Sequence, residues 1–339
     1  MHFITDLGAR YLAYAQDVFL ILFDPSQRLF WLYLLTSAVF AYFVYRHSAR
    51  TMQDDGRADE APASFLSYLF PKSVWGHPSA WLDVRYFFFH KLIGHFLLFG
   101  LLLMMMGESF RWITGESLTA FTVRTEDITS PWWVSLVYMI VVITVVDFMG
   151  FYVHYLQHKI PILWEFHKVH HSAEVMHPMS NFREHPIDNL AYLVFVGMGY
   201  GVSMGAMAMM IGHLPSMPSI LGVPILLFAF NIFGYNLRHS HIWLRWPGRW
   251  SMVFPSPAHH HVHHSCHPDH FDKNFAFLFP FWDVLFGTYI MPDDNREVRF
   301  GVAGMKSMEM DSCWKLYWIP FRKAYRRLRK SGAVSRREK

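Results

Sequence analysis

The chain contains 339 residues, of which 53% are hydrophobic and only 17% are charged. Because soluble globular domains carry about 25% charged residues, this composition excludes a disordered chain and argues against a soluble enzyme. The net charge of +4 does not indicate nucleic-acid binding, because nine of the basic residues lie in the tail 321–339, a pattern that favours contact with anionic lipid.

Five apolar stretches come near the roughly 20 residues that a helix needs to span a bilayer. In chain order they cover residues 29–45, 92–107, 131–155, 190–212 and 219–235. A short turn containing proline separates the last two, which are therefore expected to form a helical hairpin. Gly201, Gly205 and Ala206 suit close helix contact. The predicted fold is an all-α, integral membrane helical bundle of about five spans with a histidine-rich cap that holds two metals.

The distribution of lysine and arginine predicts the orientation of these spans. With the N-terminus outside, the inner segments contain 26 of the 30 basic residues, and the outer segments contain only Arg10, Arg28, Arg111 and Arg124. Basic residues accumulate on the cytoplasmic side of membrane proteins. We therefore expect the histidine motifs and the C-terminus to be cytoplasmic. The short termini, with no endoplasmic-reticulum retention signal, favour a multi-pass protein of a bacterial inner membrane.

Sixteen of the 22 histidines lie in two windows, 154–185 and 239–270. They form an HxxxH pattern at 154–158 and two HxxHH patterns at 167–171 and 260–264. Histidines three or four residues apart share one face of a helix and can approach one metal ion. Eight histidines exceed the capacity of one ion, so the patterns predict two metals, each with an open position. Imidazole suits zinc, copper, iron and nickel alike, which leaves the metal open.

The sequence lacks the signatures of other metal and redox proteins. Cys266 and Cys313 are too few for a four-cysteine zinc site or a cysteine-bound iron–sulfur cluster. The HExxH motif of zinc proteases is absent, and carboxylates do not accompany the patterns as they do in soluble di-iron bundles. Neither GxGxxG nor CxxCH occurs, so electrons for a redox reaction are expected to come from a separate protein.

The order and spacing of these motifs resemble the fatty acid hydroxylase / sterol desaturase superfamily, which consists of integral membrane, histidine-rich di-iron oxygenases. The resemblance covers roughly residues 131–292 and includes Trp164 to Glu174, Asn181 to Pro186, Ser256 to Ser265 and Phe281 to Thr288. It implies three segments. Residues 1–130 hold N-terminal spans and loops, residues 131–292 form the di-iron domain, and residues 293–339 form a polar and basic tail.

Carried over position by position, the resemblance implies nine iron ligands: His154, His158, His167, His170, His171, His239, His260, His263 and His264. It leaves His185 between two roles, a further ligand or a residue that supports the ligands. His259 and His261 are expected not to coordinate, and His177 and His241 lie off the pattern. Ligating histidines usually donate their other N–H to a carboxylate or carbonyl. Candidates for that role are Asp147, Glu174, Asp272 and Asn274, together with Glu165, Glu184, Asp188 and Asp283.

The resemblance also implies an activity, that of an O2-dependent oxygenase with two non-haem iron ions. Such an enzyme hydroxylates, or desaturates, an unactivated C–H bond of a membrane lipid or sterol-like substrate, with electrons from a separate electron-transfer protein. A fatty-acyl chain, a sterol, an ether lipid and a polar-headgroup lipid all remain open as substrates. The alternative is a non-enzymatic membrane protein that binds or transports metal. The scarcity of polar residues in the spans, apart from His95 and Asp147, disfavours that alternative.

Overall fold

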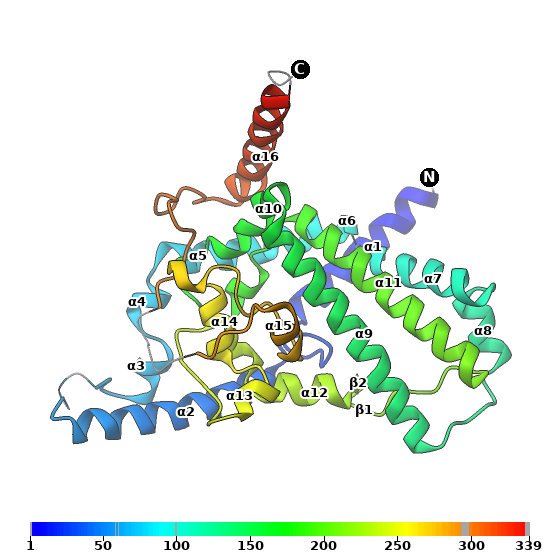
Figure 1. Ribbon diagram of the computed structural model, residues 1–339, viewed down its shortest axis with the longest axis horizontal. Coiled ribbons are helices and arrows are strands. Elements are labelled where there is room, and N and C mark those ends of the chain that lie inside the picture. Colours follow the sequence, from blue (N-terminus) through cyan, green and yellow to red (C-terminus); the bar gives the residue numbers. More distant parts are fainter. Residues whose placement is uncertain (1, 58, 60, 99, 293–297, 336–339) are drawn as a thin grey trace.

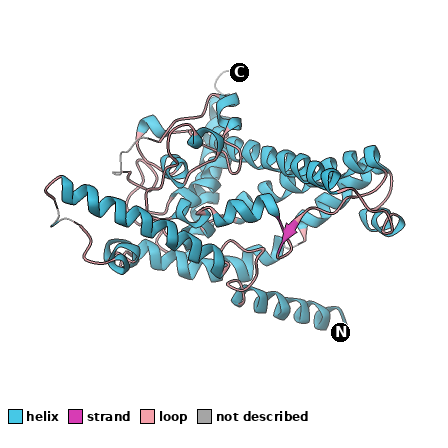
Figure 2. Cartoon of the chain, turned by 90° about the horizontal axis from the view of Figure 1, so that it is seen from below, coloured by secondary structure: helices cyan, strands magenta, loops and turns pink. Residues whose placement is uncertain are grey.

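The computed structural model describes residues 2–57, 59, 61–98, 100–292 and 298–335, and parts of the predicted tail, 293–297 and 336–339, lie outside these ranges. Nearly all its regular structure is helical (Figure 1), which agrees with the predicted class. Within the described residues, the strands are β1 (Ser219–Ile220) and β2 (Val223–Pro224), which pair antiparallel as one short hairpin (Figure 2).

The loop between α8 and α9, which ends before residue 132, separates the helices into two sets. Before it lie α1 (His2–Phe19), α2 (Trp31–Asp54), α3 (Phe65–Leu69), α4 (Lys72–Trp75), α5 (Pro78–Phe89), the π-helix η2 (His90–His95), α6 (Phe96–Leu98), α7 (Leu101–Thr114) and α8 (Leu118–Arg124). After it lie α9 (Trp132–Lys159), α10 (Pro161–His171), η3 (Pro178–Phe182), α11 (Pro186–Ile211), α12 (Ile225–Ile232), η4 (Tyr235–His239), α13 (Trp250–Val253), α14 (Pro257–His263), η5 (Pro268–His270), α15 (Phe281–Phe286) and α16 (Cys313–Ser335).

Three helical stretches of the described chain are long and apolar enough, by length and composition, to cross a membrane. They are Pro78–Thr114, Trp132–Lys159 and Pro186–Ile211. The 28 residues of α9 rise about 42 Å, which exceeds the roughly 30 Å of a bilayer's hydrocarbon core. These stretches contain the predicted span 92–107 and most of 131–155 and 190–212, although residue 99 lies outside the described ranges.

The predicted span 219–235 is not a spanning helix. Only α12 is helical there, and its eight residues rise about 12 Å. The residues before it turn sharply, because Leu221 and Gly222 both have positive φ (51° and 78°) and close the two-residue loop between β1 and β2, as in a type I′ hairpin. The expected helical hairpin is therefore wrong, and the chain returns from α11 through a β-hairpin and a short helix.

The first predicted stretch, 29–45, lies in α2, which the structure does not place among the three apolar helices of the described chain. Arg28, just before α2, lines the same cavity as His154 and His170. The stretch therefore does not separate Arg28 from the histidine motifs. The assignment of Arg28 to the opposite side of the membrane from the histidines is wrong, because a local charge pattern cannot reveal that the chain folds back onto the site.

Helix α11 packs lengthwise against α7 and α9 (Figure 1). Its glycines permit this close approach. A Cβ built on Gly201 would lie 2.2 Å from the Met106 carbonyl oxygen, and one on Gly205 would lie 2.9 Å from Ile113 Cβ. Small residues let helix backbones approach each other in membranes. The prediction for Gly201 and Gly205 is thus confirmed, whereas Ala206 is exposed.

Replacing Gly201 with alanine should destabilise the protein, because the new methyl group meets the backbone of α7, which cannot move like a side-chain tip. We expect a cost of about 1–3 kcal/mol, the usual range for overpacking. Gly107→Ala is the matched control, since nothing lies within 4 Å of a Cβ at that position of α7. Thermal unfolding in detergent compares the two variants, and equal midpoints would contradict the packing argument.

Candidate metal centre

Four elements bring the histidines together. His154 and His158 occupy the last turns of α9, and the chain then reverses at Ile160 so that Pro161 begins α10, where its fixed φ suits the first helical position. Helix α10 supplies three further histidines, η4 supplies one, and α14 with its C-cap supplies three. In chain order these seven are His167, His170, His171, His239, His260, His263 and His264.

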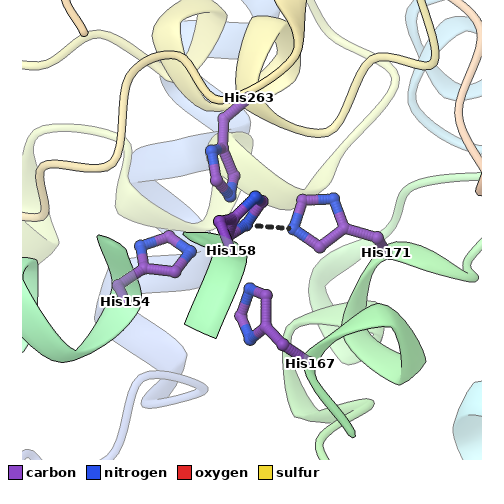
Figure 3. A group of neighbouring side chains, drawn as sticks. All are labelled: His154, His158, His167, His171 and His263. Atoms are coloured by element: carbon purple, nitrogen blue, oxygen red, sulfur yellow. Dashed lines mark hydrogen bonds between the residues drawn. The ribbon is translucent and has the colours of Figure 1, made fainter. Parts of the chain in front are cut away.

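All nine predicted ligands fall into two groups, and the groups contain no other residue of the described chain. The first group consists of His154, His158, His167, His171 and His263, and Figure 3 shows their rings converging on one point. The second consists of His170, His239, His260 and His264. Within each group, one nitrogen of every ring lies within 4.8 Å of the corresponding nitrogens of the others. The ligand assignment remains a proposal, and the geometry brings together the residues that it requires.

The two groups adjoin each other. His170 and His171 are neighbours in the chain but belong to different groups, and the rings of His171 and His264 stack with centroids 4.4 Å apart. A pair of ions held by these groups would therefore share one buried compartment.

The spacing of the nitrogens fits metal ligands. Nε2 of His260 lies 2.8 Å from Nε2 of His239 and 3.0 Å from Nε2 of His264. In the first group, Nε2 of His158 lies 3.1 Å from Nε2 of His171. For metal–nitrogen bonds of about 2.1 Å, neighbouring ligands of an octahedral ion lie about 3.0 Å apart. The observed separations are thus compatible with nitrogens around one ion.

Hydrogen bonds outside the first group orient its rings. His154 Nδ1 donates to the Phe275 carbonyl at 3.0 Å, and His263 Nδ1 donates to the Lys273 carbonyl at 2.9 Å. His167 Nδ1 lies 3.0 Å from the Asp188 carboxylate. These bonds place the hydrogen on Nδ1 and leave Nε2 as the free acceptor. Nε2 of His167 and of His263 is buried without a hydrogen-bond partner, which is costly unless a metal ion occupies the lone pair.

Burial keeps the imidazoles neutral, as metal ligation requires. It lowers the pKa of His263 to about 3. Burial, reinforced by the neighbouring rings and cations, also lowers the pKa values of five further ligand candidates well below the usual range, namely those of His170, His171, His239, His260 and His264.

Replacing Asp188 with asparagine should weaken metal binding without removing a ligand. The amide could present N–H to His167 Nδ1 and so favour the wrong tautomer. Loss of such an outer partner typically costs about 10–100-fold in metal affinity. Competition with a chelator measures the change. Asp269→Asn, at an exposed position beside His267, is the control, and equal affinities in both variants would contradict this role for Asp188.

Other expected supporting residues have different partners. Asp272 Oδ1 lies 3.4 Å from His158 Nδ1, so this carboxylate does approach a ligand candidate. Three further candidates do not approach a ligand ring. The Asp147 carboxylate accepts hydrogen bonds from the Leu278 and Phe279 N–H groups. The Glu174 carboxylate accepts one from Ser307, and the Asn274 side chain bonds to the Ile290 backbone. These three residues fasten loops near the centre rather than orient its rings.

The histidines off the pattern also have other partners. His185 lies in neither group: its Nδ1 caps α11 by accepting from the Ile187 N–H, and its Nε2 contacts the Tyr317 carbonyl. His177 pairs with Asp83, and His241 contacts the Tyr68 carbonyl. His259 and His261, although buried on α14, face Ser256 and the Leu237 carbonyl. On α14, His260 and His263 face the metal groups, whereas His259 and His261 face other partners. This alternation along one short helix separates the ligand candidates from the other histidines.

Several residues of the site carry no motif signal. Ser180 Oγ lies 3.1 Å from His239 Nδ1, and Arg238 Nη2 lies 3.3 Å from His260 Nδ1. Arg28 and Lys91, from the N-terminal region, line a cavity that borders both histidine groups. The Ser180 and Arg238 contacts could have been suspected from proximity to the motifs, whereas nothing in the sequence connects Arg28 or Lys91 with residues more than 60 positions away.

Comparison with known proteins extends this description. A family model described as fatty acid hydroxylase matches residues 139–288. Alkylglycerol monooxygenase of Danio rerio is 26% identical over 179 residues, which cover 50% of this chain and 36% of the relative. Ornithine lipid hydroxylase OlsE of Rhizobium tropici is 25% identical over 176 residues, covering 51% of this chain and 47% of the relative. The matches thus span less than half of these relatives' length. No solved structure matches the chain.

Fold and site together define a helical protein of membrane type with two adjoining, buried imidazole groups. The family match covers the segment that carries these groups. The match of residues 139–288 to the fatty acid hydroxylase family model, together with these relatives, supports the fatty acid hydroxylase superfamily for this segment.

Proposed function

We propose that the protein is an O2-dependent oxygenase that hydroxylates a C–H bond of a membrane lipid by means of two non-haem iron ions. The observation that carries this proposal is the convergence of five and four imidazoles in adjoining groups beside a cavity. The relatives named alkylglycerol monooxygenase and ornithine lipid hydroxylase support a lipid substrate. Hydroxylation is preferred to desaturation because it removes one hydrogen instead of two.

Each histidine group would hold one ion. When bound, iron supplies the activation of O2 that attack on an unactivated C–H bond requires. The chain's own residues prepare the site for it. Phe275, Lys273 and Asp188 fix three rings with Nε2 turned inward, and burial excludes bulk water from the nitrogens. Rings held in this way need no rearrangement to bind metal, which favours occupancy.

Two cavities reach the histidines from different sides. One, of about 240 Å³, borders both groups through His154, His167, His170 and His260. The other, of about 300 Å³, borders the first group through His158, His171 and His263. We assign the first to the substrate, because it touches both groups. The second is the route by which electrons from a separate electron-transfer protein would reach the first group.

The three apolar helices would hold the protein in a membrane, with the histidine groups at the cytoplasmic end of α9 and α11. Residues 131–292 would form the catalytic domain, since the family match lies within them. A lipid could then reach the site from the bilayer without leaving it.

Metal analysis of the purified protein tests this function. Mass spectrometry should find about two irons per chain, and the optical spectrum should contain no Soret band. Incubation with a reductant, lipid extract and ¹⁸O2 should then place one labelled oxygen atom in a lipid product. Stoichiometric zinc without oxygen consumption would support the metal-transport alternative instead, and haem would contradict both.

A further inference from the structure

The cavity that borders both histidine groups is lined by an unusual number of charged side chains for a site that meets a lipid. Ligand pockets are mostly lined by apolar side chains with a few polar groups. Here the lining contains five charged side chains besides the histidines, together with amides and hydroxyl groups. The five are Arg28, Lys91, Glu184, Asp188 and Arg238.

Two of these charges already have close partners. Asp188 pairs with His167 at 3.0 Å. Arg238 donates to the Phe277 carbonyl at 2.9 Å and to the Ala276 carbonyl at 3.1 Å, and it also lies beside His260. The contacts of both side chains therefore support the residues around the metal centre and are not directed to a ligand in the cavity.

Among the other three charges, Arg28 forms a side-chain hydrogen bond with Tyr235, and Glu184 forms one with Asn189. In the part of the chain that the structure describes, no ion pair within 4.0 Å includes Arg28, Lys91 or Glu184. The Arg28 guanidinium lies over the Tyr235 ring at 5.2 Å, and Lys91 Nζ lies over the Phe182 ring at 5.5 Å. Burial raises the pKa of Glu184, whereas the charges of Arg28 and Lys91 oppose this rise. Two cations thus share one carboxylate, which leaves an excess of positive charge.

A hydrocarbon chain would be a poor occupant of this space. It would displace water from Arg28 and Lys91 and leave their donors unsatisfied, which is expensive for charged groups. A phosphate or carboxylate would instead accept charge-assisted hydrogen bonds from both. The volume, about 240 Å³, is below the roughly 300–1,000 Å³ of pockets that enclose whole drug-sized ligands. It suits a headgroup better than a complete lipid.

An adjacent apolar cavity offers space for the hydrocarbon chain of the lipid. A second cavity of about 480 Å³ is lined almost wholly by apolar side chains, among them Phe230, Trp246 and Trp250. It shares Tyr235 and Arg238 with the cavity that borders both histidine groups. Arg238 therefore lines both a cavity with charged walls and an apolar cavity, which adjoin each other at this side chain.

We propose that Arg28 and Lys91 bind an anionic headgroup, a phosphate or a carboxylate, of the lipid that the histidine centre oxidises, with the hydrocarbon chain directed to the apolar cavity. This inference rests on the proposed function and narrows its substrate class from lipids in general to lipids with an anionic headgroup. Glu184 sets the net charge of the pair, so that one ligand anion neutralises the site.

Binding of three probes with related chemistry tests the inference. Dodecyl phosphate and 1-O-dodecylglycerol share a C12 chain and differ in charge, and inorganic phosphate carries the charge without the chain. Titration of the metal-loaded protein in dodecyl maltoside should give at least about ten-fold tighter binding of dodecyl phosphate than of the neutral ether. Inorganic phosphate should compete only weakly. Equal binding of the two C12 probes would overturn the proposal, and competition by inorganic phosphate as strong as by dodecyl phosphate would exclude a lipid headgroup as the ligand.

Variants then locate the charge. Arg28→Gln and Lys91→Gln should each reduce the preference for dodecyl phosphate by at least about five-fold, whereas Arg28→Lys should retain most of it. Binding of the neutral ether, measured on the same samples, reports whether a variant is still folded. Arg111→Gln is the control, because Arg111 is an exposed cation paired with Glu108 on α7. A preference that survives both substitutions to glutamine would overturn the assignment.

These measurements require no turnover, so they separate this inference from the proposed function. Charge-independent binding by a protein that oxidises lipids would reject only the headgroup site. Selective binding of dodecyl phosphate by a protein with neither iron nor oxygenase activity would reject the function and leave the site in place.

Discussion

Replacing His263 with alanine should remove at least one of two metal ions and reduce lipid oxidation by about a hundred-fold or more. His263 Nε2 is a buried atom without a hydrogen-bond partner, and its ring lies within 5 Å of the rings of His154, His158 and His171. Since loss of an outer partner alone costs about 10–100-fold in metal affinity, loss of a ligand should cost more. Metal content per folded chain and product formation measure the effect.

The matched control is His261→Ala, on the same helix. His261 is as buried as His263, yet its Nε2 contacts the Leu237 carbonyl and it belongs to neither group. This variant should keep about two metals per chain. His170→Ala should imitate His263→Ala, because it depletes the second group. Full metal content and activity in His263→Ala, or equal losses in His261→Ala, would refute the grouping.

The ligand groups could be predicted because helical spacing is a local property. HxxxH and HxxHH patterns place their rings on one face whatever the rest of the chain does. The resemblance to a family then singled out His239, which has no such spacing, and left out His259 and His261, which interrupt the pattern. The structure divides the nine between two groups in a way that no single motif shows, since α10 and α14 each contribute to both.

The residues that surround the ligands could be predicted only in part. Asp188 and Asp272 were expected among eight candidates, and both approach ligand rings. Backbone carbonyls perform the same task for His154 and His263, and a carbonyl carries no sequence signal. Asp147 and Asp283 instead accept N–H groups from residues 275–279, which hold that loop and its Phe275 carbonyl in place.

Membrane crossings were the least predictable part, because hydropathy measures composition rather than path. The stretch 219–235 is mostly apolar, yet Leu221 and Gly222 turn the chain at a point that a window of 17 or more residues averages away. The stretch 29–45 is apolar on both faces of α2, since Tyr33 and Ala41 are fully buried and Phe43 is exposed, so its composition alone does not reveal whether it crosses a membrane.

Replacing Asp83 with asparagine should destabilise the whole protein, although Asp83 lies outside every motif. Its carboxylate pairs with Arg183 and, at 3.0 Å, with His177. Arg183 is 2% exposed and also donates to the carbonyls of Ser172 and Ser79. Removing one partner of a buried pair leaves an uncompensated charge and costs about 3–5 kcal/mol. Native proteins are stable by only about 5–15 kcal/mol, so the thermal midpoint should fall by many degrees.

The effect should extend to the metal centre, because Ser172 follows His170 and His171 at the end of α10. Asp55→Asn provides the control: Asp55 also pairs with an arginine, Arg57, but both side chains are about half exposed, and exposed pairs contribute only about 0–1 kcal/mol. Thermal unfolding of both variants, with and without iron, measures the difference. If Asp83→Asn unfolds at the same temperature as Asp55→Asn, the buried pair does not hold α5 to the histidine-bearing helix, and that helix must be positioned by its contacts with α9, α16, α11 and η3.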